Sequence, residues 1–228
     1  MRAPLSVIIP TLNAEERLPG CLASLYEGVS EGLIRELIVA DGGSTDATPN
    51  IADDVGAEWI PCSPSRGGQL RAGADRARGE WLLFVHADTV LQEGWTEIVE
   101  AHIKGSAKAG YFDLKFDVSG APAHVVAGWA NLRSWLFSLP YGDQGLLISR
   151  RFHKENGGFD DIPLMEDVAL ARRIGRRGFV RLRGQARTSA QRYISQGWLR
   201  RGARNLWTLA RFFVGVSPER LAREYRAR

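Results

Sequence analysis

The first hundred residues alternate short apolar runs with segments of helical periodicity, and this alternation restricts the fold more than any other feature. The apolar runs have the length of buried strands and lie at residues 5–9, 34–40, 57–60 and 81–85. The helical segments lie at residues 16–26, 48–55, 69–78 and 95–104. Strands separated by helices of this length form βαβ units. We therefore predict an α/β fold, a doubly wound and mostly parallel sheet with helices on both faces.

The pattern changes after residue 108. Residues 111–118 alternate apolar and polar side chains, as in a half-exposed strand, and an aromatic-rich helix is predicted at 123–139. A strand at 146–148, a helix at 167–177 and a strand at 179–182 follow.

The chain is long enough to bury a full core, and one domain is predicted over residues 1–228. Within it we expect a first half of about 1–107, a second half of about 108–185 and a C-terminal helical extension of about 186–228. No internal repeat or low-complexity stretch divides the chain further.

Composition and charge describe an ordinary globular protein that is mildly basic. Of its residues 44% are hydrophobic and 25% are charged, and the formal net charge is +4. This charge suits an anionic ligand or surface, but no stretch resembles a nucleic-acid-binding module, so we expect no nucleic-acid partner. Cys21 and Cys62 lack metal-ligand spacing and are expected to be reduced. No signal-peptide pattern and no apolar run of about 18 residues is present. We expect a cytoplasmic location, in solution or peripheral on the inner membrane face.

Acidic residues stand at the ends of predicted strands and at the start of a predicted helix. Asp41 follows one apolar strand directly, and Asp88 follows another after two residues. Glu166 and Asp167 open a helical segment after the apolar stretch 163–165. Ligands of an open α/β sheet bind outside the carboxyl ends of its strands, so these carboxylates are expected to face a ligand.

Asp41 and Arg66 are candidates for holding a nucleotide. A carboxylate at a strand end is a strong acceptor for the N–H of a base, and the glycines after Asp41 let the backbone approach a ligand closely. The alternative is that Asp41 only organises a turn. Arg66 stands where a Gly-containing loop opens a helix, whose free N–H groups suit a diphosphate. A plain surface loop is the alternative there.

The other acids are candidates for metal binding and for proton transfer. A divalent cation such as Mn²⁺ or Mg²⁺ takes one or two carboxylates plus substrate phosphates, which suits Asp88. His86 alternates with Asp88 and either points to the same crevice or packs in the core. Glu166 and Asp167 are candidates for the general base that activates an acceptor hydroxyl. Acids in the first turn of a helix also serve as caps, and this alternative stays open.

Taken in order, these stretches resemble the family 2 glycosyltransferases of the GT-A fold. The motifs that carry the resemblance span most of residues 5 to 178. They are VIIPTLNAEERL from Val7, ADGGSTDAT from Ala40, SRGGQLRAGA from Ser65, ARGEWLLFVHADT from Ala77, GDQG from Gly142, GGF from Gly157 and PLMEDVALARRI from Pro163.

The resemblance implies an inverting, metal-assisted transfer of a sugar from a nucleoside-diphosphate sugar, with a UDP-linked donor expected, to a hydroxyl of a small-molecule or lipid-linked acceptor. The first half of the chain would bind the nucleotide and the second half the acceptor. The implied nucleotide-sugar contacts are Pro10, Thr11, Asp41, Arg66 and Ala87, and the implied metal residues are Asp88 and His86. The implied catalytic residues are Asp167 as the base, Glu166 beside it, and Asp143 facing the donor sugar or the acceptor.

The chain departs from the family pattern at two positions. His86 stands where the family has the first acid of an Asp-x-Asp pair, which leaves the metal dependence and the ion open. Leu12 stands where the family often has an aromatic residue near the base. The wording FVHADT, GDQG and PLMED is most similar to a small single-domain subgroup found beside radical-SAM enzymes and linked to arsenosugar biosynthesis.

Two other functions stay open. A nucleotidyltransferase generally needs a Gly-rich basic loop after the first strand, whereas residues 10–16 are acidic and lack glycine. A degenerate nucleotide-sugar-binding or membrane-docking module is the other alternative, and it is motivated by His86 in place of an acid.

Residues 198–214 have the pattern of an amphipathic helix. One face carries Trp198, Leu199, Leu206, Trp207, Leu209, Phe213 and Val214, and the opposite face carries Arg200, Arg201, Arg204 and Arg211. Such a helix can lie on anionic lipid. The alternative, which we expect, is a helix docked on the domain with its arginines in water. The aromatic residues Trp129, Trp135 and Phe137 favour the membrane alternative.

Overall fold

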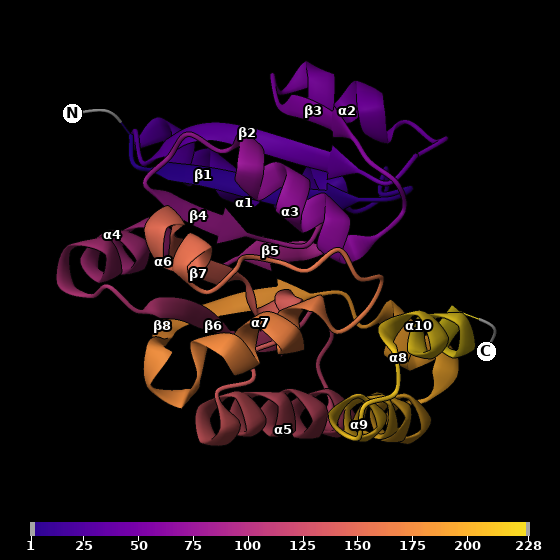
Figure 1. Cartoon of the computed structure of the whole chain (residues 1–228). Helices are drawn as coiled ribbons and strands as arrows, with labels where there is room; N and C mark the ends of the chain where they lie inside the picture. Colours follow the sequence, from indigo (N-terminus) through magenta and orange to yellow (C-terminus); the bar gives the residue numbers. More distant parts are fainter. Residues whose placement is uncertain (1–2, 227–228) are drawn as a thin grey trace.

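The computed structural model describes residues 3–226, whose strands form one eight-stranded sheet (Figure 1). Across the sheet the strands follow the order β3-β2-β1-β4-β7-β6-β8-β5. Their bounds are Leu5–Thr11 for β1, Ile34–Asp41 for β2, Glu58–Pro61 for β3, Trp81–Phe84 for β4, Thr89–Leu91 for β5, Ala109–Phe116 for β6, Leu146–Ser149 for β7 and Phe179–Thr188 for β8.

Parallel pairing dominates the first half of the sheet. β1 pairs in parallel with β2 and β4, and β3 pairs in parallel with β2. β7 joins β4 to β6 by antiparallel pairing, β6 pairs in parallel with β8, and β5 closes the edge against β8. The predicted α/β fold with a mostly parallel sheet is confirmed. The carboxyl ends of β1, β2 and β4 therefore meet at one edge of the sheet.

The helices connect the strands and cover both faces of the sheet. The longer helices are α1 Leu18–Ser30, α3 Arg66–Arg76, α4 Trp95–Gly105, α5 Ala121–Phe137, α7 Glu166–Ile174, α9 Trp198–Phe213 and α10 Pro218–Arg226. The shorter ones are α2 Thr48–Asp54, α6 Arg150–Glu155, α8 Gln191–Gln196 and the 3₁₀ turns η1 Gly142–Gln144 and η2 Arg176–Gly178.

The side chains of β1 explain why both faces need a cover. Leu5, Val7 and Ile9 belong to a buried cluster with α1 and α4, whereas Ile8 belongs to a second cluster with α3 and α7. Successive residues of a strand point to opposite faces, and all four side chains are fully buried. A strand covered on both faces is apolar throughout, which is the run that identified it in the sequence.

A third, smaller cluster lies between β6 and the helices α5, α8 and α9. The Phe116 ring meets Trp198 edge-on at a centroid distance of 5.1 Å, and Tyr193 stacks on Trp198 at 5.0 Å. Figure 1 shows α5 and α9 along the bottom of the molecule, below α7 and α8. The C-terminal helices are therefore packed on the second half of the chain through aromatic side chains.

Some predicted boundaries are wrong. The strand expected at 179–182 continues to Thr188, because Leu182, Gly184 and Ala186 keep alternating into the buried face. The first of the C-terminal helices, α8, begins at Gln191. The helix expected to reach 177 ends at Ile174, since Gly175 has a φ of 72°, and a 3₁₀ turn follows.

The predicted orientation of α9 is also wrong. Arg201 and Thr208 are the buried residues of this helix, whereas Leu199 and Trp207 are 89% and 65% exposed. Arg201 donates a hydrogen bond of 2.5 Å to the Tyr225 hydroxyl of α10, and its guanidinium lies 5.8 Å from the centre of the Tyr193 ring. Aromatic faces and hydroxyl groups from α8 and α10 attract the arginine face inward. Most of the apolar face is left pointing outward, whereas Trp198 packs inward against Phe116 and Tyr193.

Candidate active site

Asp41 lies at the end of β2 and organises the loop that follows. Its oxygens accept hydrogen bonds from the Thr11 hydroxyl (2.8 Å), the Gly43 and Ser44 backbone N–H groups (2.8 and 2.7 Å) and the Ser44 hydroxyl (2.5 Å). A carboxylate offers about four acceptor positions, so the protein itself uses all of them. This arrangement is the one expected if Asp41 organises the turn after β2. A base N–H would reach Asp41 only if one donor, such as the Ser44 hydroxyl, turned away.

Gln69 joins the ends of two strands, and the sequence interpretation did not single it out. Its side-chain amide donates to the Thr11 carbonyl (2.7 Å) and to the Ala40 carbonyl (2.8 Å), and the side chain is 5% exposed. Gln69 lies one turn after Arg66 on α3. The same helix therefore carries Arg66 and holds the ends of β1 and β2 in register.

Asp88 is half-buried in the turn between β4 and β5. Among residues 3–226, no side chain or backbone group forms a hydrogen bond or ion pair with its carboxylate. The ring of His86 packs against Gly142, where an added Cβ would lie 2.3 Å from the imidazole Nε2. Burial, together with the charges of Arg66 and Arg192, lowers the pKa of His86 well below its usual range. His86 is therefore neutral at pH 7, and its ring is packed against Gly142, whereas the Asp88 carboxylate is unpaired within the described range.

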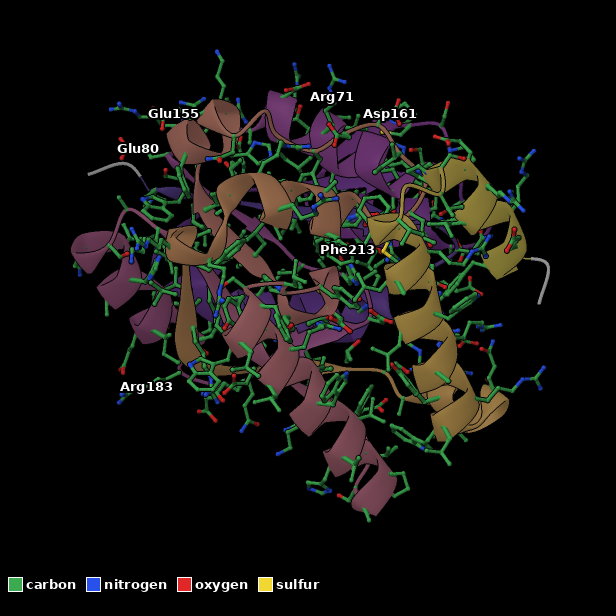
Figure 2. The ribbon with its side chains drawn as sticks, turned by 60° about the horizontal axis from the view of Figure 1, so that its bottom comes forward. Arg71, Glu80, Glu155, Asp161, Arg183 and Phe213 are labelled. Atoms are coloured by element: carbon green, nitrogen blue, oxygen red, sulfur yellow. The ribbon has the colours of Figure 1, made fainter. Side chains whose placement is uncertain are left out.

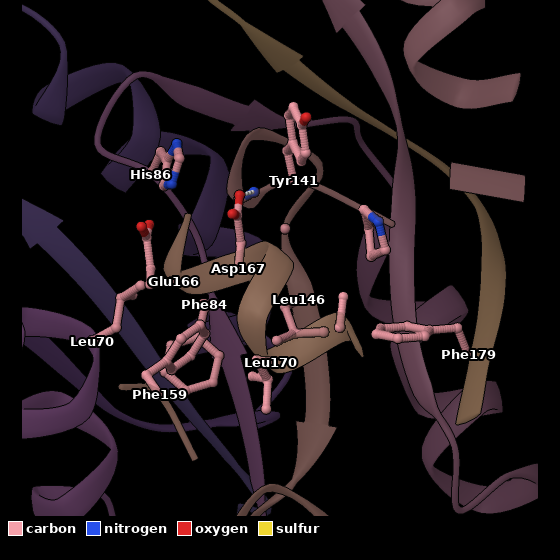
Figure 3. Close-up of a pocket in the computed structure, with 14 residues that line it drawn as sticks. Leu70, Phe84, His86, Tyr141, Leu146, Phe159, Glu166, Asp167, Leu170 and Phe179 are labelled. Atoms are coloured by element: carbon pink, nitrogen blue, oxygen red, sulfur yellow. Dashed lines mark hydrogen bonds between the residues drawn. The ribbon is translucent and has the colours of Figure 1, made fainter. Parts of the chain in front are cut away.

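Glu166 and Asp167 open α7 after Met165, which has a φ of 68°. Glu166 is 2% exposed, its Oε1 lies 3.9 Å from Nε of Arg66, and its Oε2 has no hydrogen-bond partner in the described part of the chain. Burial and the adjacent Asp167 carboxylate raise the pKa of Glu166, and Arg66 acts in the opposite direction. Asp167 accepts the Gly142 N–H at 2.9 Å, the dashed line in Figure 3.

Asp143 lies in the η1 turn, and Gln144 anchors this turn through buried hydrogen bonds. The fully buried Gln144 amide accepts from the Ser134 hydroxyl (2.5 Å) and donates to the Phe112 carbonyl (3.1 Å). The Oδ1 atom of Asp143 is buried and has no partner among residues 3–226. Burial, with the Asp167 and Asp88 carboxylates, raises the pKa of Asp143 to about 6 against the attraction of Arg133 and Arg66.

These electrostatic effects show which predicted residues the fold brings together. The charge of Arg66 lowers the pKa of Asp143 and of Glu166. The carboxylates of Asp88 and Asp167 raise the pKa of Arg66 and of Asp143. Asp41 and Thr11 lie at the adjoining strand ends and are joined to this group through α3. Pro10 and Ala87 are half-buried at the same edge, after the buried parts of β1 and β4. The nucleotide and catalytic candidates thus border one region.

A small cavity is lined in part by these residues (Figure 3). Figure 3 shows His86, Glu166 and Asp167 on one side of it and the apolar Phe159 and Leu170 on the other. Its volume is about 30 Å³. That is room for about one or two waters, so a nucleotide sugar would have to bind on the open side of the acids.

Arg133 and Tyr141 border the acids, and the sequence interpretation did not include them. The Arg133 guanidinium lies 3.4 Å from the centre of the Tyr141 ring, and its Nη2 is buried without a partner among residues 3–226. The side chain is 7% exposed on the inner face of α5. The sequence signal that could have identified Arg133 is a charged residue within a mainly apolar helix, because such a charge is rarely buried without a partner.

The raised pKa of Asp143 predicts a pH-dependent gain from Asp143→Asn in the protein without donor. The folded pKa of about 6 exceeds the usual value near 3.9, so the unfolded chain releases this proton first and stability falls as pH rises from about 4 to about 6. The amide removes this loss and should add about 2–3 kcal/mol at pH 7 and nothing below pH 4. Thermal unfolding at both pH values measures it, with the exposed Asp54→Asn as the control. An equal gain at both pH values would contradict the explanation.

A mostly parallel first half of the sheet, whose strand ends meet at one edge, followed by a mixed second half is the arrangement of the GT-A class. A family model described as Glycosyl transferase family 2 matches residues 6–142. The chain belongs to glycosyl transferase family 2.

Curated relatives match part of the chain. A PGL/p-HBAD biosynthesis glycosyltransferase of Mycobacterium bovis (strain BCG / Pasteur 1173P2) is 40% identical over 104 residues, which is 42% of this chain and 40% of the relative. A dolichyl-phosphate beta-glucosyltransferase of Drosophila melanogaster is 41% identical over 99 residues, 37% of this chain and 30% of the relative. The chain thus spans well under half the length of these relatives.

Solved structures share the fold over most of the chain. S. aureus TarS 1-349 superposes with a TM-score of 0.64 at 19% identity, covering 82% of this chain and 60% of that one. Glucosyl-3-phosphoglycerate synthase from Mycobacterium tuberculosis, in complex with Mn²⁺, UDP and glucosyl-3-phosphoglycerate, gives a TM-score of 0.58 at 21% identity, with coverage of 79% and 70%. These likenesses establish the GT-A fold.

Proposed function

We propose that the chain transfers a sugar from a UDP-linked donor to a hydroxyl of an acceptor, with inversion at the sugar carbon. The observation that carries the proposal is the convergence of Arg66, Asp88, Asp143, Glu166 and Asp167 beside the ends of β1, β2 and β4. The complex of the structural neighbour with Mn²⁺ and UDP supports the donor class.

In this proposal the first half of the chain holds the donor. Thr11 and Asp41 would lie against the nucleoside, with Pro10 and Ala87 beside it, and the Arg66 guanidinium would lie near the diphosphate. Arg66 is 40% exposed at the start of α3, where the helix dipole also favours an anion.

The residues near Asp88 fit a divalent cation that is shared with the substrate. Among residues 3–226 no group of three or more His, Cys, Asp and Glu side chains could hold a metal. One unpaired carboxylate is enough when substrate phosphates supply the other oxygens, as Mn²⁺ and Mg²⁺ sites in phosphoryl-group enzymes show. When bound, the cation would neutralise charge on the departing diphosphate. His86 would join Asp88 only if its ring left Gly142.

The second half would supply the proton acceptor and the contacts to the sugar. Asp167 would take the proton of the acceptor hydroxyl as its oxygen bonds to the sugar carbon and the bond to the diphosphate breaks. Asp143, with an unpartnered Oδ1, would face the donor sugar or the acceptor. Glu166 would keep Arg66 in place from behind.

Three finer assignments accompany this proposal. We propose that residues 1–228 form one domain, because the sheet runs unbroken through both halves. We propose that the chain acts at the cytoplasmic side, in solution or against the inner membrane face, on a small-molecule or lipid-linked acceptor. The motifs FVHADT, GDQG and PLMED support membership of the chain in the radical-SAM-associated, arsenosugar-type subgroup.

A thermal-shift panel of UDP sugars with and without Mn²⁺ tests the proposal. A ligand that binds the native state at about 100 times its Kd stabilises it by about 2.7 kcal/mol, which is a rise in Tm of about 5–10 °C for a chain of this size. Asp88→Asn should remove the part of the shift that needs Mn²⁺. No shift with any UDP sugar would contradict the proposal, and a shift without UDP release at any divalent ion would favour the degenerate binding module.

A further inference from the structure

The helices α5 and α9 expose large apolar side chains on the same side of the molecule. Figure 2 brings this side forward and shows both helices across it, with Phe213 near one end of α9. The two helices contact each other. We call this surface the α5–α9 face, and its main residues are Trp129, Leu132 and Trp135 of α5 and Leu206, Trp207 and Phe213 of α9.

The apolar side chains of the α5–α9 face are largely exposed to solvent. Trp135 and Trp207 are 60% and 65% exposed, and Trp129 is 48% exposed. Single apolar side chains on a surface are ordinary, whereas a run of them over two adjacent helices marks an interaction site. Among residues 3–226 no segment covers the face, and no helix there is long and apolar enough to cross a bilayer.

The charge beside the face identifies the partner. Residues 171–228 contain 16 arginines, no lysine and two acids, although the whole chain has a net charge of only +4. Arg172 lies 5.1 Å from the centre of the Phe213 ring, Arg200 is exposed on α9, and the Arg176 carbonyl accepts the Ser138 hydroxyl just after α5. None of these three arginines pairs with a carboxylate in the described part of the chain.

Apolar helices bordered by unpaired arginines fit an anionic lipid surface better than a second copy of the chain. A symmetric dimer through the α5–α9 face would bring the same arginine-rich surfaces of two copies together, and like charges repel. Anionic headgroups attract the arginines instead, and the tryptophans suit the boundary between headgroups and acyl chains.

We propose that the α5–α9 face docks the protein on an anionic bilayer, with Trp129, Trp135 and Trp207 in the headgroup region and Arg172, Arg176 and Arg200 against lipid phosphates. The face borders the candidate site at two places. Tyr141 of the cavity wall follows four residues after the end of α5, and Arg172 is on the same helix as Asp167. If the proposed function holds, a hydroxyl carried by a membrane lipid would meet the acids directly.

Sedimentation with vesicles tests the docking without any turnover. Vesicles of phosphatidylcholine alone are compared with vesicles of equal parts phosphatidylcholine and phosphatidylglycerol. The full chain should bind the second kind at least about tenfold more tightly, and added salt should weaken binding. Trp135→Gln with Trp207→Gln should abolish most binding. Arg172→Gln, Arg176→Gln and Arg200→Gln together should weaken it by more than about tenfold, since each arginine contributes about fivefold.

Matched variants on another side of the molecule separate docking through the α5–α9 face from nonspecific binding to vesicles. Tyr26→Gln with Val29→Gln replaces exposed apolar residues of α1, and Arg71→Gln with Arg151→Gln removes exposed arginines elsewhere. These proteins should bind vesicles like the unaltered chain, and all variants should keep its Tm.

Three results would overturn the docking proposal. They are no binding to either vesicle, equal binding to both, and a dimer in solution that the Trp135 and Trp207 changes dissociate. The last result would assign the face to a second copy. The binding of UDP sugars is measured separately, so failure here leaves the proposed transferase untouched.

Discussion

Asp167→Asn should lower turnover by about 10³-fold while the donor still binds. A general base contributes about 10²–10⁴-fold, and an amide cannot take the proton of an acceptor hydroxyl. The amide oxygen can still accept the Gly142 N–H that Asp167 accepts at 2.9 Å, so the η1 turn should keep its place. UDP release from the donor that the thermal-shift panel selects measures turnover, and the same panel measures donor binding.

Glu166→Gln separates the two acids of the pair. Glu166 is buried against Arg66, so its loss should weaken donor binding through Arg66 more than it slows the chemical step. Glu155→Gln, at an exposed ion pair with Arg151, should leave both quantities unchanged. Turnover near that of the unaltered protein in Asp167→Asn, with a large loss in Glu166→Gln, would move the base to Glu166.

Gly67→Ala should destabilise the protein by about 2–3 kcal/mol, because the new methyl group has no room. A Cβ at Gly67 would lie 2.1 Å from the Asp160 carbonyl oxygen and 2.8 Å from that of Ile162, both backbone atoms. The Gly67 N–H also donates to the Ile162 carbonyl at 3.0 Å. Thermal unfolding should show a fall in Tm of about 4–12 °C.

Gly128→Ala is the matched control for Gly67→Ala. Gly128 also lies in a helix, α5, but an added Cβ meets no atom within 4 Å. Alanine favours a helix over glycine by about 1 kcal/mol, so this variant should be slightly stabilised. Because the segment held by Gly67 leads to Glu166 and Asp167, Gly67→Ala should also slow turnover. An unchanged Tm in Gly67→Ala would show that the segment moves away freely and does not position the acids.

The strands β1 and β4 could be predicted because they are buried on both faces of the sheet. The apolar run of β1 could be recognised in the sequence for this reason, and Asp41 could be recognised because it ends the apolar run of β2. β5, with three residues, is too short to produce a periodic pattern. The end of β8 was missed because Gly184 and Ala186 fill the buried positions with small side chains, which a search for large apolar residues overlooks.

The sequence predicted only part of the candidate site. Asp88, Asp143 and Asp167 are in the sequence pattern, and the fold brings their charges close enough to act on one another. Gln69 was not found, because its importance comes from contacts with the ends of β1 and β2, which are far away along the chain. Arg133 was not found, because the sequence does not show that the fold buries it against the Tyr141 ring.

The sequence by itself determined the order of strands and helices and the residue types at the strand exits, since both follow from near neighbours along the chain. It also determined that α9 has an apolar and a basic face. Only the tertiary structure decided which face is buried, because that choice depends on Tyr193 and Tyr225, which form cation–π and hydrogen-bond contacts with Arg201. Amphipathic periodicity records that two faces differ, and the partners available in three dimensions decide which of them meets the protein.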